Sequence, residues 1–342
     1  MPSTTAKRPL SDRMLAALAV ALVVAACSSA TSSAVQSPFP TSGGSSAPPL
    51  APPTPAPTPG HVALQLKAGP GPVDVAAGFG SIWITDHHGG SVTRLDPTTG
   101  RVLATIPVGT QPASMTIGAG SVWTANYDGT IGRIDPTTNQ AVSVGQFPHL
   151  CGWPTVADGA IWVYECDAGA PYVARVDIAT GRTTATIPAG SDQSTLLWAD
   201  DVLWMTTFPD GELLRIDPRT GSVLQRVALP GCPVLGRQSY GFGSLWVSLG
   251  FCSDSPLVIR LDPRTGAIQA RIKAIAGGSA SAGNGAVWVG AGDGTIDRID
   301  PTTLTATAWT QLGPVYGLEN GFGALWAVSF DADTVWKIDT AP

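Results

Sequence analysis

Charged residues are scarce in this sequence, and so are the motifs that mark well-known catalytic sites. Asp, Glu, Lys and Arg make up 13% of the 342 residues, and the sequence contains 4 histidines. The chain contains no Ser-His-Asp spacing, phosphate-binding loop, EF-hand, HExxH pair or CxxC pair. No reaction can therefore be assigned from a motif alone.

The sequence also lacks a hydrophobic run of the roughly 20 residues that a spanning helix needs. A shorter apolar run, Met14 to Ala26, follows the basic residues Lys7, Arg8 and Arg13, a pattern typical of an export signal. The run ends in Val-Ala-Ala before Cys27, which resembles a lipobox. We therefore expect residues 1–27 to be a lipoprotein signal peptide and Cys27 to be the lipidated N-terminus. The alternative is an ordinary secretory signal with an incidental cysteine.

Charge is absent altogether from residues 28–60, which consist mainly of Pro, Ser, Thr, Ala and Gly. Such a composition cannot bury a core and favours extended polyproline II, so we expect a disordered tether. At roughly 3.1 Å per residue its reach is on the order of 100 Å. The protein is thus expected to be exported and extracytoplasmic, and attached to the cell membrane through its lipid anchor only.

Acidic residues outnumber basic ones, and the net charge of the chain is −6. Lys7, Arg8, Arg13 and Asp12 give the first 60 residues a charge of +2, so residues 61–342 carry −8. An acidic domain without basic clusters repels phosphate backbones. Nucleic acid is therefore not expected as a partner.

A short phrase with a central tryptophan, Gly-Phe-Gly-Ser-Ile-Trp-Ile at residues 78–84, recurs in related forms at intervals of roughly 40 residues. A second phrase, basic–aliphatic–Asp, follows each time. The tryptophans are Trp83, Trp123, Trp162, Trp204, Trp246, Trp288 and Trp326. This period, with short apolar runs and tight turns, is typical of β-propeller blades. We predict an all-β fold, a seven-bladed β-propeller over residues 61–342, in which the tryptophans and recurring basic residues are packing and scaffold.

Each repeat is expected to give a four-stranded blade, with strands a, b, c and d in chain order. The tryptophan lies in strand b, and strand c ends in an Asp-Pro-x-Thr-Gly turn whose glycine takes the left-handed conformation. Blade six has Leu304 at the glycine position, so a different turn is expected there. The seventh repeat ends without a strand d, whereas residues 61–69 resemble one. We expect this N-terminal strand to complete the last blade and close the ring.

Four cysteines remain besides Cys27. Cys151 and Cys166 flank Trp162, and Cys232 and Cys252 flank the tryptophan two blades later. Each pair brackets one a–b hairpin, whose two ends are neighbours, so the expected disulfides are Cys151–Cys166 and Cys232–Cys252. A zinc site is the alternative, but the sequence has no CxxC spacing.

The b–c and d–a loops of a propeller gather on one face, here called the loop face, where ligand and partner sites usually occur. Candidate ligand-binding carboxylates on these loops include Asp128, Glu165 and Asp210. Histidine and carboxylate occur together at Asp86-His87-His88. These three residues are candidates for a site that binds Mg²⁺, Ca²⁺ or a cationic ligand, with an imidazole as general base. Solvated loop carboxylates and ordinary turn residues are the alternative.

Strand a supplies a second set of candidates. Asp74 and Arg237 precede their tryptophans by nine residues, and Glu319 precedes its tryptophan by seven. All three side chains are expected to face the ring centre. There they either orient a ligand or form a buried ionic cluster that fixes blade packing.

The repeated GxGSxW and RxDPxTG phrases over residues 61–342 resemble the virginiamycin B (streptogramin) lyase-like and YVTN-type seven-bladed propellers. Streptogramin lyases open a cyclic depsipeptide by elimination, using Mg²⁺ with a catalytic His and Glu on the late blades. The histidines of this sequence are His61, His87, His88 and His149, and none lies in blades six or seven.

We therefore expect a monomeric, non-catalytic propeller lipoprotein. Its loop face would bind a small-molecule or polymer ligand or an envelope protein. The sequence assigns no cofactor beyond the candidates Mg²⁺ and Ca²⁺. The alternative is a metal-assisted lyase or hydrolase of the streptogramin lyase type.

Overall fold

The computed structural model describes residues 59–166, 170–189, 195–207, 210–230, 237–249, 257–274 and 277–340. Cys27 and the rest of residues 1–58 lie outside this described part, as do Cys232 and Cys252. The described residues form strands and turns without a helix, so none of their segments is a helix able to cross a membrane.

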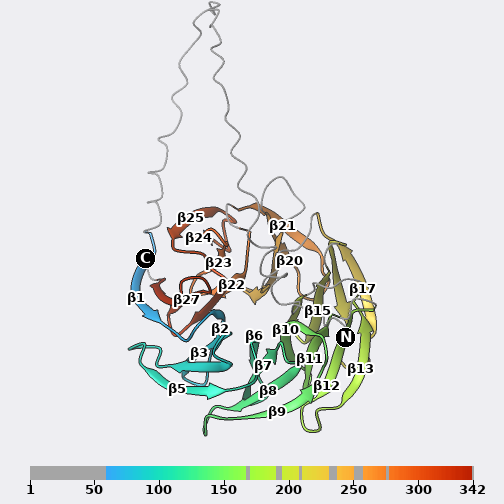
Figure 1. Ribbon diagram of the computed structural model, residues 1–342. Coiled ribbons are helices and arrows are strands. Elements are labelled where there is room, and N and C mark those ends of the chain that lie inside the picture. Colours follow the sequence, from blue (N-terminus) through green and yellow to red (C-terminus); the bar gives the residue numbers. More distant parts are fainter. Residues whose placement is uncertain are drawn as a thin grey trace, which may run out of the picture. The chain divides into compact units, whose positions relative to one another are not determined.

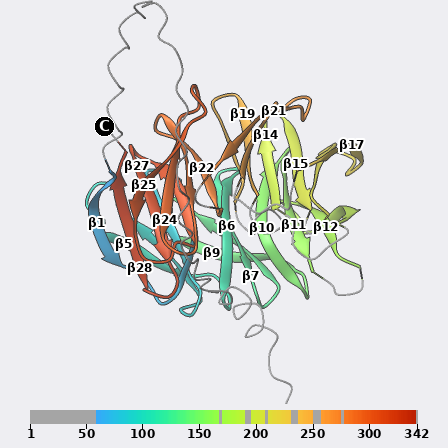
Figure 2. The same ribbon diagram turned by 90° about the horizontal axis from the view of Figure 1, so that it is seen from above.

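The strands form seven antiparallel sheets of four strands each, arranged as blades of a ring (Figure 1). This arrangement confirms the predicted seven-bladed β-propeller. The first strand of each blade lies near the ring centre and the last lies at the rim, as β2 and β5 do in Figure 1. Figure 2 shows the same blades turned by 90°.

Blade one consists of β2 (Pro72–Gly78), β3 (Ser81–Asp86), β4 (Ser91–Leu95) and β5 (Val102–Pro107). Blade two consists of β6 (Pro112–Gly118), β7 (Ser121–Asn126), β8 (Thr130–Asp135) and β9 (Gln140–Gln146). Blade three consists of β10 (Leu150–Ala157), β11 (Ala160–Glu165), β12 (Tyr172–Asp177) and β13 (Thr183–Pro188). Blade four consists of β14 (Thr195–Ala199), β15 (Val202–Thr207), β16 (Glu212–Ile216) and β17 (Val223–Ala228).

Blade five consists of β18 (Ser239–Gly241), β19 (Ser244–Leu249), β20 (Leu257–Leu261) and β21 (Ile268–Lys273). Blade six consists of β22 (Ala280–Gly283), β23 (Ala286–Gly290), β24 (Thr295–Ile299) and β25 (Ala306–Gln311). Blade seven consists of β26 (Gly317–Gly321), β27 (Ala324–Ser329), β28 (Thr334–Asp339) and the N-terminal strand β1 (His61–Lys67).

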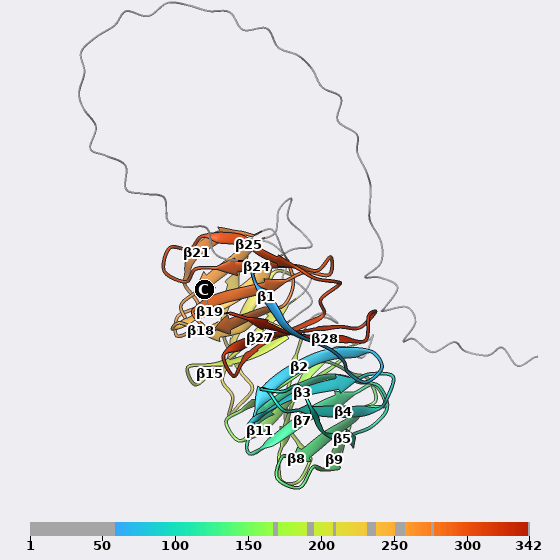
Figure 3. The same ribbon diagram turned by 90° about the vertical axis from the view of Figure 1, so that its left-hand side faces the viewer.

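The strand β1 pairs antiparallel with β28 and is the outermost strand of its sheet (Figure 3). The register runs from His61 opposite Asp339 to Lys67 opposite Thr334. Blade seven therefore combines strands from the two ends of the described chain, and β1 covers the outer edge of β28.

The core lies between neighbouring blades, and the seven repeat tryptophans are at its centre with 0% exposure. In five blades the indole N–H donates to the glycine carbonyl five residues earlier, as Trp83 does to Gly78 at 3.0 Å. The Arg94 guanidinium lies 4.8 Å from the centre of the Trp83 ring, and three other blades repeat this stacking. Packing and scaffold are thus confirmed as the roles of these residues.

The c–d turns are held as predicted, with one correction in blade six. Asp96 accepts backbone N–H bonds from Thr98 and Thr99, and Gly100 has a φ of 71°. Leu304 was expected to change the turn, but it takes the same left-handed conformation, with a φ of 60°. Its N–H donates to the Asp300 carbonyl at 2.9 Å, the equivalent of the Gly100 bond. The hydrogen bonds of this turn outweigh a left-handed penalty of roughly 1–2 kcal/mol.

Candidate functional site

Three charged side chains from distant repeats meet near the ring centre, and we call them the central cluster. Arg237, just before β18, donates from Nη2 to Asp74 Oδ2 on β2 at 2.9 Å and from Nη1 to Glu319 Oε2 on β26 at 3.2 Å. Nη2 also donates to the Met115 carbonyl on β6 at 2.6 Å. The Arg237 side chain thus connects blade five to blades seven, one and two.

The Asp74 carboxylate has hydrogen-bond partners at both of its oxygens. Oδ1 accepts the Val75 N–H and Oδ2 accepts the Met115 N–H, each at 2.9 Å, in addition to the bond from Arg237. The side chain of Asp74 is 4% exposed, whereas those of Arg237 and Glu319 are 23% and 25% exposed. The structure therefore contains the ionic cluster, and the role of these side chains in orienting a ligand stays a prediction.

Burial changes the proton affinity of both carboxyl groups in this cluster. It raises the pKa of Glu319 to about 7, because desolvation and the nearby Asp74 outweigh the Arg237 guanidinium. Desolvation also raises the pKa of Asp74, although Arg237 and the bonds from Met115 and Val75 oppose it. The central cluster therefore contains a half-buried carboxyl group that titrates near neutral pH.

Asp86 ends β3 and His87 and His88 follow it on the loop face, but their side chains have different partners. The Asp86 carboxylate accepts the hydroxyl groups of Ser91 at 2.9 Å and Thr93 at 2.6 Å. Burial raises the Asp86 pKa, although these hydroxyl groups and the Gly69 N–H oppose the shift. Among the described residues, no group of three or more His, Cys, Asp or Glu side chains could hold a metal ion.

The two imidazoles belong instead to a set of five rings, which we call the aromatic cluster. Its members are His87, His88, Tyr127, Tyr316 and Phe330. The centre of the His87 ring lies 5.4 Å from that of Tyr127 and 5.7 Å from that of Phe330. His88 lies 5.0 Å and Tyr316 5.8 Å from Phe330. The cluster spans blades two, one and seven.

The backbone under the aromatic cluster is closely packed and hydrogen-bonded. The His87 and His88 N–H groups donate to the carbonyls of Gly71 and Pro70 at 3.0 and 3.1 Å. Gly71 has a φ of 68°, and a Cβ there would lie 2.8 Å from His88 Cδ2 and 3.0 Å from Phe330 Cε2. Glycine is therefore required beneath these rings by both conformation and space.

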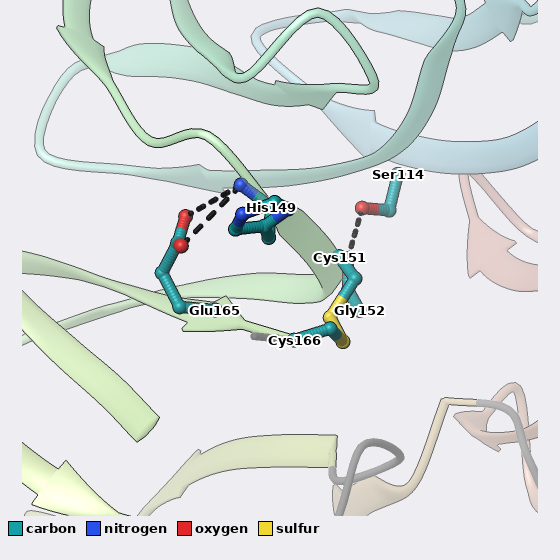
Figure 4. Close-up of a disulfide and its surroundings, with 6 residues drawn as sticks. All are labelled: Ser114, His149, Cys151, Gly152, Glu165 and Cys166. Carbon is teal, nitrogen blue, oxygen red and sulfur yellow. Dashed lines mark hydrogen bonds between the residues drawn. A yellow bond between two sulfur atoms is a disulfide. The ribbon is translucent and has the colours of Figure 1, made fainter. Parts of the chain in front are cut away.

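Glu165 and the predicted disulfide lie at the loop-face end of blade three (Figure 4). Cys151 and Cys166 are bonded, with their Cα atoms 6.0 Å apart, which confirms the first predicted pairing. The Glu165 carboxylate is buried and accepts the His149 backbone N–H at 3.3 Å to each oxygen. The second predicted pairing, Cys232–Cys252, lies outside the described residues.

Asp128 and Asp210 lie on the loop face of different blades. The Asp128 carboxylate accepts the backbone N–H groups of Thr110 at 2.7 Å and Thr130 at 3.0 Å. Partial burial acts to raise the Asp128 pKa, but the Thr130 and Thr110 hydrogen bonds hold it below its ordinary value. Asp210 is exposed in the turn before β16. The structure therefore does not gather Asp128, Glu165 and Asp210 into one site.

Tyr127, Tyr316 and Phe330 were not anticipated from the sequence, although a signal for two of them was present. His87, Tyr127 and Phe330 each stand four residues after the tryptophan of their blade. An aromatic ring at the same loop position in blades one, two and seven becomes one cluster because blade seven lies beside blade one. Tyr316, which precedes β26, has no equivalent signal.

Comparison with known proteins agrees on the fold. No family model matches the chain, and no curated protein sequence matches it. Among solved structures, virginiamycin B lyase from Staphylococcus aureus has a TM-score of 0.67 at 21% identity, over 81% of this chain and 98% of the lyase. The hydrazine synthase of Kuenenia stuttgartiensis has a TM-score of 0.67 at 13% identity, over 81% of this chain and 97% of that chain. The chain is thus a seven-bladed β-propeller similar in fold to virginiamycin B lyase.

Proposed function

We propose that this protein is a lipid-anchored, extracytoplasmic β-propeller that binds a ligand or a protein partner on its loop face, without catalysis. Export and anchoring rest on the signal-like residues 1–27, on Cys27 and on the uncharged segment 28–60. The binding role rests on the aromatic cluster.

The aromatic cluster supports binding because it places large rings at the surface of a rigid scaffold. Tyr127 is 44% exposed and His88 is also exposed, while Tyr316 and Phe330 are partly exposed. Loops that carry function are typically fixed by a rigid framework, and aromatic side chains are enriched in binding interfaces. The hydrogen-bonded loops beneath these rings reduce the ordering cost of binding.

The test is capture of partners from the native envelope by the purified protein. We expect Tyr127→Ala/Phe330→Ala to lose at least one partner that the wild type retains. The matched control is Phe79→Ala/Phe322→Ala, which removes two exposed rings, 42% and 49% exposed, from the a–b turns at the opposite face. Equal capture by wild type and the loop-face variant would contradict the proposal.

A lyase or hydrolase resembling virginiamycin B lyase is the second candidate function. It is favoured by the fold similarity and by Glu319, whose pKa of about 7 suits a general acid or base. Thermal melts with Mg²⁺ or Ca²⁺ provide the discriminating measurement. A cation-dependent rise in melting temperature that His87→Ala/His88→Ala removes would favour a metal-assisted enzyme, and the absence of any rise would count against it.

A further inference from the structure

The loops that carry the aromatic cluster all lie at the same end of neighbouring blades. In blade one, Asp86 of β3 lies opposite Pro72 of β2 and opposite Ser91 of β4. In blade two, Asn126 lies opposite Pro112. In blade seven, Ser329 lies opposite Thr334, and Thr334 lies opposite Lys67. The rings that follow these positions therefore form one continuous surface across three blades.

The rings of this surface meet at steep angles. The interplanar angle is 87° between His87 and Tyr127, 72° between His87 and His88, and 66° between His87 and Phe330. Rings packed edge to face leave no space between them, and His87 is buried at 3% exposure, so a cation can contact only the exposed faces of rings such as Tyr127 and His88. Burial lowers the pKa of His87, although the bond to the Pro112 carbonyl opposes this shift. The central imidazole is therefore neutral at neutral pH and does not repel a cation.

Carboxylates border the rings on two sides. Asp331 is exposed and accepts the Tyr316 hydroxyl at 3.0 Å. Burial and the neighbouring Asp331 raise the pKa of Tyr316 to about 12, so this phenol remains a donor. Asp333 is exposed and accepts the Gly71 N–H at 2.7 Å, and Asp128 is exposed beside Tyr127. Each carboxylate is thus positioned from one side and accessible to a ligand from the other.

One basic group lies at this surface, because the exposed Lys67 donates its ammonium N–H to the Ala332 carbonyl, between Asp331 and Asp333. The three carboxylates of the surface outnumber this single positive charge. Arg237 pairs with Asp74 and Glu319 in the central cluster. Residues 61–342 carry a net charge of −8, so the long-range field also attracts cations.

We propose that the aromatic cluster and the bordering carboxylates Asp128, Asp331 and Asp333 bind a cationic segment of a partner protein, through arginine or lysine side chains. The inference deepens the proposed binding function and rests on it. An arginine satisfies both features of the surface, because its guanidinium stacks on aromatic rings and pairs with carboxylates. The open surface, which spans three blades, suits an extended segment with several cations better than a small enclosed ligand.

The test uses a fluorescein-labelled peptide in which arginine alternates with glycine, and measures binding to the full chain by fluorescence anisotropy. The control peptide carries citrulline, an uncharged analogue of arginine with a similar shape. We expect the citrulline peptide to bind at least about ten-fold more weakly. Tyr127→Leu and Asp331→Asn should each weaken binding of the arginine peptide by about two- to five-fold, the range of an exposed cation–π contact.

Asp201→Asn is the matched charge control. Asp201 is exposed at the a–b turn of blade four, on the opposite face, and its φ of 59° suits asparagine. The Asp201 and Asp331 variants have the same net charge, so an effect of net charge alone would be equal in both. Equal losses in these two variants, or equal binding of the arginine and citrulline peptides, would overturn the inference.

The same variants separate this inference from the proposed function. If Tyr127→Ala/Phe330→Ala loses an envelope partner that Asp331→Asn retains fully, the rings bind without a cation; the inference then fails and the proposed function stands. If both variants capture all partners like the wild type, the proposed function itself fails. Melting temperatures close to that of the wild type show that the variants are folded.

Discussion

At the scale of single residues, Arg237 determines what the ring centre can do. Three of its N–H groups are directed to blades that lie 82, 163 and 122 residues away in sequence. Arg237 is a partly buried arginine paired with two carboxylates, and removal of one partner of such a pair is costly. Desolvation raises the pKa of Glu319, and Arg237, which also pairs with the more deeply buried Asp74, offsets this shift only in part.

Glu319 makes the stability of the propeller dependent on pH. Burial raises its pKa from an ordinary value of 4.5 to about 7 in the folded protein. A carboxyl group with a raised pKa stabilises the fold fully below about 4.5 and loses that contribution as the pH rises through about 7. Glutamine cannot ionise, so the melting temperature of Glu319→Gln relative to wild type should increase by about 2–4 °C between pH 5 and pH 8.

The control for Glu319→Gln is Glu212→Gln, whose ion pair with Arg226 is at the surface. Surface ion pairs contribute about 0–1 kcal/mol to stability. The melting temperature of Glu212→Gln relative to wild type should therefore change little over the same pH range. A constant difference for Glu319→Gln across this range would show that Glu319 ionises equally well in the folded and unfolded states.

At the scale of elements, the a–b hairpin is the unit that the sequence repeats and varies. The first residue of its turn is left-handed in several blades, and it is phenylalanine in three of them: Phe79, Phe242 and Phe322. Ala119 and Asn284 occupy the same position in blades two and six, so the turn does not require an aromatic residue. In blade three the variation lies at the other end of the hairpin, where Cys151 and Cys166 are bonded.

The disulfide should stabilise the propeller by reducing the conformational entropy of the unfolded chain. Its two cysteines are separated by 15 residues, a loop for which the chain-entropy estimate is about 3 kcal/mol. Cys151→Ser/Cys166→Ser should therefore lower the melting temperature under oxidising conditions. Reductant should lower the wild-type value further than that of the variant. Equal effects of reductant on both proteins would mean that this bond does not contribute.

At the scale of the whole molecule, the last blade contains a strand from the other end of the described chain. β1 covers the edge of β28, and without it that edge would expose a row of unpaired backbone groups. We expect removal of this strand to disturb the contact between the first and last blades, where the aromatic cluster also lies.

Deletion of residues 59–67 should lower the melting temperature and produce oligomers through the exposed edge of β28. Deletion of nine residues from within 28–58 is the control, since that segment contributes no described strand. A synthetic peptide with the sequence His61 to Lys67 should restore a monomer by strand addition. A deletion variant that stays monomeric with an unchanged melting temperature would argue against closure by β1. Size-exclusion chromatography and thermal melting supply both measurements.

The sequence was sufficient for the repeat, the strands and the packing role of the tryptophans. These features depend on local patterns, namely the roughly 40-residue period, apolar strand phrases and turns closed by Asp side chains. The Cys151–Cys166 bond was predictable for the same reason, because both cysteines flank one hairpin. The prediction for the Leu304 turn was wrong because it considered only the preference of glycine for the left-handed conformation. The hydrogen bond from Leu304 N–H to the Asp300 carbonyl holds the same turn in blade six.

The partners of the candidate residues were decided only by the tertiary structure. Asp86, His87 and His88 are adjacent in sequence, yet Asp86 bonds to Ser91 and Thr93 while both imidazoles pack against Phe330. Closure of the ring places blade seven beside blade one, which brings residues near positions 87 and 330 into contact. The period of the sequence determines the blades, but contacts between distant blades depend on how the ring closes and on how far side chains such as Arg237 extend across its centre.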